Sequence, residues 1–404
     1  MTEGYKLHWD LKSSEIYNHA SFGATPVGVQ DYAERIRARF NRAREEFYND
    51  IYLQALPGQL SAVAGFVHAD ANDLVMVDNV TEGFNSVIKS LSLGPGDEVL
   101  ITNRMYPNYP PVLEELSRRQ GFEIVTADIP AFPSGRDEVI DAILSRTSEK
   151  TRLTIIDHVI SLALVLPVKE IVSALQKRGI DCFVDGAQAI GQVPVDINDI
   201  GAAYYAGNHH KWLCAPVGSG FLHVCKDKQG PIVPAVGSGA AKTDKPFQER
   251  FGWTGTKDVT PRLCVEKTID YMARLHPQGW PGICERNHAL ALQVRDIFVD
   301  KLGIDKPCPD EMIGAMFTLP LGALELPSEI DALPAHLRVA KLTQERAGVS
   351  AYAFPHEGHY LLRVSAHLYN EARDYEMLAD AVADIVRDYG PQLPQPQPAP
   401  AADM

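Results

Sequence analysis

A lysine that directly follows two histidines is the residue with the clearest chemical potential in this sequence. It lies in GNHHKWLCAP (207–216), a few residues after the apolar run AAYYAG (202–207). Lys211 could be a solvated surface charge, a clamp for a phosphate or a reactive amine. An amine held among apolar groups has a lowered pKa and becomes a nucleophile. The adjacent His210 can donate to an oxyanion or a phosphate, so the local context leaves all three alternatives open.

Two other stretches could supply a partner for a bound cofactor. NVTE (79–82) stands between a predicted strand and a predicted helix, where free backbone N–H groups and the helix dipole can bind an anion. Asp185 ends the apolar run IDCFVD (180–185), and a poorly solvated carboxylate needs a partner, such as a cationic ring nitrogen. Each stretch alone is also compatible with an ordinary helix cap or turn.

The elements that must position these residues alternate between apolar strands and amphipathic helices, which indicates the α/β class. Strands are predicted at 73–77, within 94–102, and at 123–127, 152–159, 180–185, 202–207 and 219–224. Helices are predicted at 81–91, 110–121 and 167–179. This alternation implies right-handed crossovers and a mainly parallel, buried sheet. Ligands of such sheets bind at the carboxyl ends of the strands, where all three features fall.

The character of the chain changes after about residue 260. Longer helices are predicted at 286–303 and 374–390, with a strand at 359–368 between them. We therefore expect an N-terminal segment (1–25), a large domain (26–260), a smaller α+β domain (261–390) and a Pro/Gln-rich disordered tail (391–404).

The sheet carries, in chain order, an anion-binding site at 79–82 (the anion seat), a buried acid and a lysine. This combination matches the needs of pyridoxal 5′-phosphate. Its phosphate needs a seat, its ring nitrogen needs an acid, and its aldehyde needs an amine. NAD and ATP fit less well, because no GxGxxG opens a first βα unit and no GxxxxGK[ST] loop is present.

The sequence resembles class V aminotransferase-type enzymes of pyridoxal-phosphate fold type I, in the isopenicillin N epimerase-like branch. The resemblance covers residues from about 17 to 390. It is carried by YNHASFGATP (17–26), VDNVTEGFNSVIKSL (77–91), VDGAQAIGQVPVDI (184–197), YYAGNHHKWLCAPVGSGFL (204–222), WTGTKD (253–258) and RVSAHLYNEARDYEML (363–378). It implies a mainly parallel seven-stranded sheet in the large domain.

The resemblance also implies how the cofactor is held. Lys211 matches the lysine that forms the Schiff base and moves the Cα proton. Asp185 matches the partner of the pyridine nitrogen, and Gln188 matches the donor to the ring hydroxyl. Tyr106 matches an aromatic residue that stacks on the ring. The residues that match the phosphate seat are Thr81, the amide of Glu82, Asn208 and His210.

Substrate and subunit contacts follow from the same resemblance. Arg363 matches the arginine that binds the substrate α-carboxylate, and Asn18 to Gly23, including Ser21 and Phe22, match a segment that closes over the substrate. Gly255 and Thr256 match a loop that reaches the phosphate in the neighbouring subunit, which implies a homodimer with shared active sites.

One segment departs from the relatives, which commonly have His-Val-Thr-Ser-Pro-Thr where this chain has HVISLA (158–163). Ser161 keeps its place beside the cofactor, but two hydroxyl groups are replaced by Ile160 and Ala163. We expect this loop to shape the space above the ring and to influence the choice of reaction.

Several reactions at Cα of an amino acid remain open. A cysteine desulfurase is disfavoured, because the segment before Arg363 (350–363) contains no cysteine. His356 and His359 in that segment have no third ligand nearby, so no metal is expected and a loop at the substrate entrance is favoured. The leading hypothesis is a C–S lyase of secondary metabolism acting on an S-substituted cysteine. The alternatives are decarboxylation-coupled oxidative deamination, epimerisation, transamination and a non-enzymatic scaffold.

The net charge, the apolar segments and the cysteines limit the classes of partner and the compartment that we expect for this protein. A net charge of −14 without a long basic run argues against nucleic acids and anionic membranes. No segment approaches the roughly 18 apolar residues that span a bilayer, and the N-terminus has no apolar run typical of a signal peptide. The scattered six cysteines indicate reduced thiols in the cytoplasm.

Overall fold

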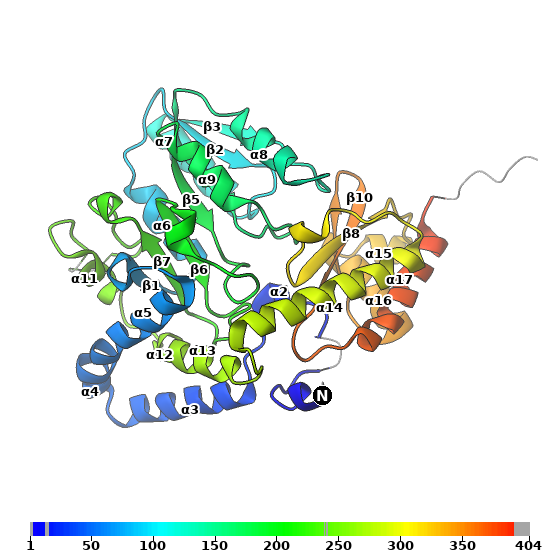
Figure 1. Cartoon of the computed structure of the whole chain (residues 1–404), viewed down its shortest axis with the longest axis horizontal. Coiled ribbons are helices and arrows are strands. Elements are labelled where there is room, and N and C mark those ends of the chain that lie inside the picture. Colours follow the sequence, from blue (N-terminus) through cyan, green and yellow to red (C-terminus); the bar gives the residue numbers. More distant parts are fainter. Residues whose placement is uncertain (1–2, 13–15, 238, 240, 392–404) are drawn as a thin grey trace, which may run out of the picture.

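The computed structural model describes residues 3–12, 16–237, 239 and 241–391 (Figure 1). Apart from Pro391, the predicted disordered tail lies outside the described residues. The chain forms a large unit around one sheet and a smaller unit around a second sheet, joined by a long helix. Among the described residues, no helix has the length and apolar character needed to span a membrane.

The large sheet confirms the predicted α/β class. Within the described residues it has seven strands in the order β1-β7-β6-β5-β4-β2-β3. β7 runs antiparallel to β1 and β6, and the other neighbouring strands pair in parallel. The strands are β1 (Leu74–Val77), β2 (Glu98–Thr102), β3 (Glu123–Ala127), β4 (Thr151–Asp157), β5 (Asp181–Asp185), β6 (Tyr204–Asn208) and β7 (Gly220–Val224).

Helices cover both faces of this sheet, so alternate strand residues enter two separate cores (Figure 1). On one face lie α5 (Leu53–Val67), α8 (Arg136–Leu144) and α9 (Val168–Gln176). On the other lie α6 (Val80–Ser90), α7 (Pro110–Gln120) and α11 (Phe247–Gly252). In β5, for example, Val184 points into the first core and Phe183 into the second, as the period of two of a strand requires.

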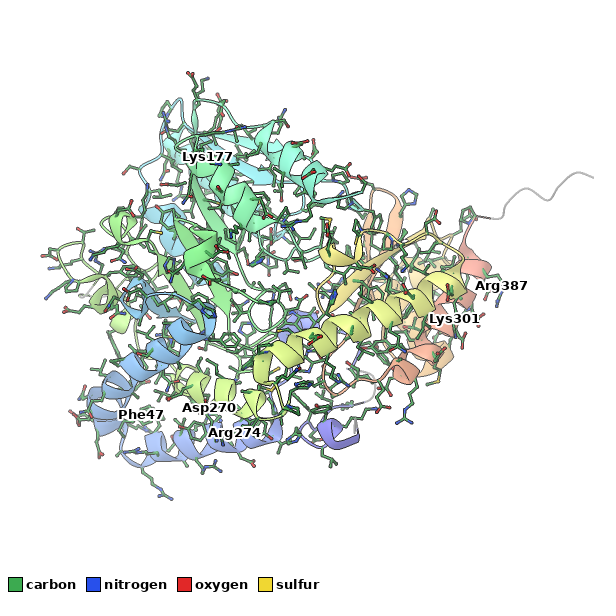
Figure 2. The ribbon with its side chains drawn as sticks, viewed as in Figure 1. Phe47, Lys177, Asp270, Arg274, Lys301 and Arg387 are labelled. Carbon is green, nitrogen blue, oxygen red and sulfur yellow. The ribbon has the colours of Figure 1, made fainter. Side chains whose placement is uncertain are left out.

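The small unit is an antiparallel sheet covered by helices. Its strands, in the order β8-β10-β9, are β8 (Met316–Gly322), β9 (Tyr352–His356) and β10 (His359–Ser365). Its helices are α14 (Gly279–Leu302), α15 (Ser328–Asp331), α16 (Ala335–Ala347) and α17 (Glu376–Tyr389). Lys301, near the end of α14, forms an ion pair with Asp380 of α17 on the outer surface (Figure 2). Of the three strands, only β10 is predicted from the sequence.

The change from one core to the other falls within α14. Helix α13 (Val265–Ala273) contributes Val265 and Met272 to the core of the large unit, and Trp280 at the start of α14 belongs there too. From Leu290 onward, α14 contributes to the core of the small unit. We therefore propose a large domain that extends past the predicted boundary at residue 260 into α14.

The N-terminal segment crosses between the two units. It contains α1 (Glu3–Lys6) and α2 (His19–Phe22) and leads into α3 (Val27–Arg42). Gly23 has φ +73, and a Cβ there would collide with the carbonyl oxygens of His210 and Lys211. Only glycine tolerates both this backbone conformation and this close approach. The segment is thereby packed directly on the loop that carries the lysine.

Candidate active site

A cavity of about 470 Å³ lies at the carboxyl ends of β1, β4, β5 and β6, where the large unit meets β9 and β10. The structure brings most of the predicted site residues together on its wall. Those that line it are Ser21, Phe22, Thr81, Tyr106, Ser161, Asp185, Gln188, Asn208, His210, Lys211 and Arg363.

Lys211 occupies a bend just after β6 and is half-buried. Burial lowers the pKa of its amine to about 8, although the negative charge of Asp185 opposes the shift. A lysine with this pKa is neutral in a substantial fraction of molecules near neutral pH. The reactive amine is thus the alternative that the surroundings of Lys211 favour.

Asp185 ends β5 and is 4% exposed. Its carboxylate accepts a hydrogen bond from the Tyr109 hydroxyl at 2.7 Å and another from the Ala187 amide at 2.8 Å. Burial raises the pKa of this carboxyl, while the two hydrogen bonds act in the opposite direction. Tyr109 is a site residue that the sequence analysis missed. Its position three residues after Tyr106, at the start of α7, was the available signal.

The anion seat is the first turn of α6. The Asn79 side chain caps this helix by accepting from the Glu82 amide at 2.9 Å, and the Asn208 side chain accepts from the Val80 amide at 3.0 Å. The predicted Glu82 amide is therefore already engaged in this structure. Thr81 lines the cavity directly beside the helix start. His210 lines the cavity beside this turn, and an imidazole N–H could donate to a phosphate there.

Gln188 is held in place from two sides. Its amide nitrogen donates to the Ala20 oxygen at 2.9 Å, and its amide oxygen accepts from the Trp212 indole at 2.8 Å. One hydrogen of the amide nitrogen remains for the predicted bond to the ring hydroxyl. Tyr106 lies at the rim of the cavity, edge-on to Tyr109 with 5.3 Å between ring centroids.

Arg363 of β10 is buried on the opposite side of the cavity and retains its charge. Its guanidinium donates to the Ser161 main-chain oxygen and to the Asn18 and Ser21 side chains, each at 3.0 Å. The Tyr352 ring covers the guanidinium face, with 4.5 Å from Cζ to the ring centroid. Burial lowers its pKa to about 10, so it stays positive at neutral pH. All its acceptors are neutral, which leaves the charge available for a carboxylate.

The loop at residues 160–163 corrects one expectation. The side chains of Ile160 and Ala163 are 0% and 3% exposed and belong to the core of the large unit. They do not line the cavity, so our expectation that the loss of two hydroxyls changes the cofactor face is wrong for these positions. Ser161 does line it and binds Arg363 through its main-chain oxygen.

Gly255 and Thr256 lie outside the main cavity of the chain. They are exposed and line a smaller hollow together with Asp78, Asn79 and Glu82, on the outer side of the α6 N-terminus. His356 and His359 face each other across the β9–β10 hairpin and do not line the cavity, although Tyr352 of the same hairpin does.

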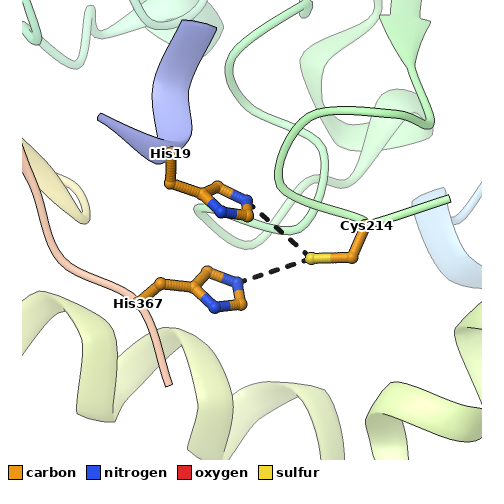
Figure 3. Close-up of side chains that lie close together, drawn as sticks. All are labelled: His19, Cys214 and His367. Carbon is orange, nitrogen blue, oxygen red and sulfur yellow. Dashed lines mark hydrogen bonds between the residues drawn. The ribbon is translucent and has the colours of Figure 1, made fainter. Parts of the chain in front are cut away.

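Behind the lysine loop, His19, Cys214 and His367 form a buried group whose ligand atoms lie within 4.8 Å of one another (Figure 3). The two imidazole rings are stacked, with 4.1 Å between centroids and 14° between planes. A shared metal ion would lie out of the plane of at least one ring, where the nitrogen lone pair does not point. The group is better explained as packing that supports the loop.

The fold and this set of residues define a cofactor-dependent enzyme of the pyridoxal-phosphate type. A cystine C–S lyase, C-DES, solved with its product cysteine persulfide, superimposes with a TM-score of 0.76 at 19% identity, over 93% of this chain and 97% of that one. The likeness establishes the fold.

The aminotransferase class-V family profile matches residues 28–293, and the chain belongs to this family. Isopenicillin N epimerase of Amycolatopsis lactamdurans is 33% identical over 387 residues, 91% of this chain and 94% of the relative. L-cysteine desulfhydrase of Arabidopsis thaliana is 29% identical over 402 residues, 92% of this chain and 87% of the relative. The resemblance inferred from the sequence is thereby confirmed.

Family membership indicates pyridoxal 5′-phosphate as the cofactor, and the residues present fit it. Lys211 would carry it, Asp185 would face its ring nitrogen, and the first turn of α6 with His210 would hold its phosphate. The donor set fits this group, because an amine of lowered pKa, a buried carboxyl group and a helix N-terminus face one cavity.

Proposed function

We propose that this enzyme cleaves the C–S bond of an S-substituted cysteine in secondary metabolism by β-elimination. The observation that carries the proposal is that Lys211 and Arg363 line one cavity, and that no cysteine is among the described residues that line it. This arrangement provides a base for the Cα proton and a cation for the α-carboxylate, without a thiol that could accept sulfur from the substrate.

The bound cofactor supplies an electron sink for the bond broken at Cα. The residues of the chain supply orientation and proton transfer. Arg363 pairs with the substrate carboxylate and so fixes which Cα bond faces the cofactor plane. The amine of Lys211, with its lowered pKa, takes up the Cα proton. Tyr352 covers the face of the guanidinium, and Phe22 lines the cavity.

The cysteines of the chain support elimination over sulfur transfer. Cys214 is the cysteine in the lysine loop, but it is fully buried and its burial raises the pKa of its thiol, which keeps it protonated. A thiol in this state is a poor nucleophile. Release of a free thiol or sulfide fits this site better than formation of an enzyme persulfide.

The charges of the cavity favour a substrate with a single carboxylate. Among the described residues that line it, Arg363 is the sole arginine and Lys211 the sole lysine. The remaining wall near the entrance is aromatic or apolar, with Phe22, Val217 and Tyr352. An S-alkyl or S-aryl substituent matches such a wall.

Epimerisation is the second candidate, because a relative with 33% identity over nearly the whole chain is an isopenicillin N epimerase. Decarboxylation-coupled oxidative deamination, considered from the sequence, loses the support of the 160–163 loop, since Ile160 and Ala163 lie in the core.

The decisive assay incubates the purified enzyme with an S-alkyl cysteine and identifies the products. Pyruvate, ammonia and a free thiol are expected. An aldehyde with release of CO₂ and uptake of oxygen, or a D-amino acid without loss of sulfur, would overturn the proposal. The cofactor itself is tested by absorbance. The near-ultraviolet or violet band of the holoenzyme should vanish in Lys211→Ala.

The proposal includes a homodimer in the cytoplasm, with Gly255 and Thr256 contacting the cofactor phosphate of the neighbouring subunit. Both residues are exposed and free of any role in the cavity of their own chain. Light scattering should give the mass of two chains. Loss of cofactor affinity in Thr256→Ala without loss of folding would support the shared site, and unchanged affinity would contradict it.

A further inference from the structure

A second carboxyl group lies beside Asp185. β4 ends at Asp157 and β5 ends at Asp185, and the two residues are paired in register in the parallel sheet. Paired residues of neighbouring strands point to the same face of a sheet, and both side chains line the cavity. They are 5% and 4% exposed, respectively. The end of the sheet therefore presents two buried carboxyl groups to one ligand.

The two carboxyl groups have very different surroundings. Asp185 accepts hydrogen bonds from the Tyr109 hydroxyl and the Ala187 amide, which stabilise its ionised form. Asp157 accepts no hydrogen bond from any other residue in the described part of the chain, and no cation lies within ion-pair distance of it there. Two neighbouring negative charges repel each other, so one carboxyl group of the pair favours a proton. The proton is favoured on the group that lacks hydrogen-bond donors.

The electrostatics agree with this geometry. Burial raises the pKa of Asp157 well above its usual range, and the charge of Asp185 raises it further, while Lys211 acts in the opposite direction. For Asp185, burial also raises the pKa, but the bonds from Tyr109 and Ala187 oppose it. The pair is therefore expected to hold a single proton near neutral pH, and Asp157 is the residue that holds it.

We propose that Asp157 and Asp185 form a proton-sharing pair in which Asp157 is the neutral acid and Asp185 the anion, so that one negative charge faces the ring nitrogen of the cofactor. The inference rests on the proposed cofactor site and extends it. Asp157 is a positioning residue, because it acts through Asp185: its proton keeps the total charge of the pair at one negative charge. The sequence carried a signal for it, since Asp157 also follows an apolar run directly.

Loss of the Asp157 proton at high pH would place a second negative charge beside the first. The groups that face it are Asp185 of β5, Lys211 after β6 and Tyr109 at the start of α7. The added negative charge would favour protonation of the Lys211 nitrogen. It would thereby change the absorbance of the bound cofactor. The holoenzyme should therefore show an alkaline transition in its visible spectrum that belongs to Asp157.

The experiment makes the same isosteric substitution at both carboxyl groups of the holoenzyme. Asp157→Asn imitates the neutral acid, whereas Asp185→Asn removes the anion. We expect Asp157→Asn to bind pyridoxal 5′-phosphate within roughly threefold of the wild type and to lose the alkaline transition, whereas Asp185→Asn should weaken binding roughly tenfold or more and alter the spectrum at all pH values. Binding is measured by fluorescence titration and the transition by absorbance against pH.

Two results would overturn the proposal. One is a loss of cofactor affinity in Asp157→Asn as large as that in Asp185→Asn, in a protein with unchanged circular dichroism and thermal midpoint. The other is an alkaline transition that persists unchanged in Asp157→Asn. Asp157→Glu, which keeps a titratable group, should retain the transition at a shifted pH. None of these readouts uses a sulfur substrate, so failure of the proposed lyase reaction would leave this test intact.

Discussion

The Nε2 atom of His19 lies 3.1 Å from the main-chain oxygen of Lys211, which joins the N-terminal segment to the loop of the reactive amine. A carbonyl oxygen only accepts, so Nε2 carries the hydrogen and Nδ1 accepts from the Tyr369 hydroxyl at 2.9 Å. Burial lowers the pKa of His19 to about 4, so the neutral ring persists at neutral pH. This neutral imidazole fixes the lysine loop from behind.

Replacing His19 with alanine should destabilise the protein by about 1–3 kcal/mol, because it leaves the buried Lys211 oxygen and Tyr369 hydroxyl without this partner. Urea unfolding measures the change. His336→Ala is the matched control, since His336 is exposed on α16 and should change the free energy of unfolding little. Equal losses in the two variants would show that the contact with Lys211 contributes nothing.

Removing the Tyr109 hydroxyl should move the acid limb of the activity profile. The bond from Tyr109 lowers the pKa of Asp185, so Tyr109→Phe raises that pKa and the needed anion forms only at higher pH. The acid limb of kcat/KM should therefore shift upward in pH. Tyr106→Phe is the control, because the Tyr106 hydroxyl accepts from Asn108 and does not touch Asp185. An unshifted limb in Tyr109→Phe would contradict the assignment.

The rate at which the apoenzyme takes up pyridoxal 5′-phosphate should follow the neutral fraction of Lys211. With a pKa of about 8, the rate should rise through that pH and level off above it. The charge of Arg363 lowers this pKa, so Arg363→Gln should move the midpoint to higher pH. Stopped-flow absorbance gives the rates. A flat profile between pH 7 and pH 9, taken here as roughly one unit on either side of that pKa, would show that the amine is not the titrating group.

Arg363→Lys should lower kcat/KM about 10- to 100-fold, because one charge-assisted hydrogen bond of the bidentate pair is lost, at about 1.5–3 kcal/mol. The loss should appear mainly in KM, since the substrate carboxylate is bound in the ground state as well. The cofactor band should stay unchanged, because Arg363 lies across the cavity from the α6 N-terminus. A changed band with an unchanged KM would place Arg363 on the cofactor instead.

Much of the site could be predicted from short stretches of the chain. Apolar runs that end in a single polar residue identify strand ends, and those of parallel strands meet at one edge of a sheet. Asp185, Lys211 and the first turn of α6 were found in this way, and the structure places all three on one cavity. Arg363 was found only through the resemblance to a family, because a lone arginine in a strand has no local signature.

Other features depend on contacts between distant segments and were missed. β8 and β9 gain their strand character by pairing with β10, and the Tyr109 hydroxyl gains its role by meeting Asp185, which lies 76 residues away. The direction of the 160–163 side chains was likewise misjudged from the sequence. Ile160 and Ala163 lie in the core of the large unit, and Ala163 has φ +68, a conformation that its neighbours in the sequence do not predict.

The sequence by itself determined the α/β class, because that depends on residue type and local periodicity. Its resemblance to a known family indicated the family and proposed the reactive groups. The tertiary structure alone decided how the groups are charged. Asp157 and Asp185 each follow an apolar run in the same way, yet one has two hydrogen-bond donors and the other has none from elsewhere in the described chain. Such a difference arises from which distant donors the fold brings near, and it places the proton.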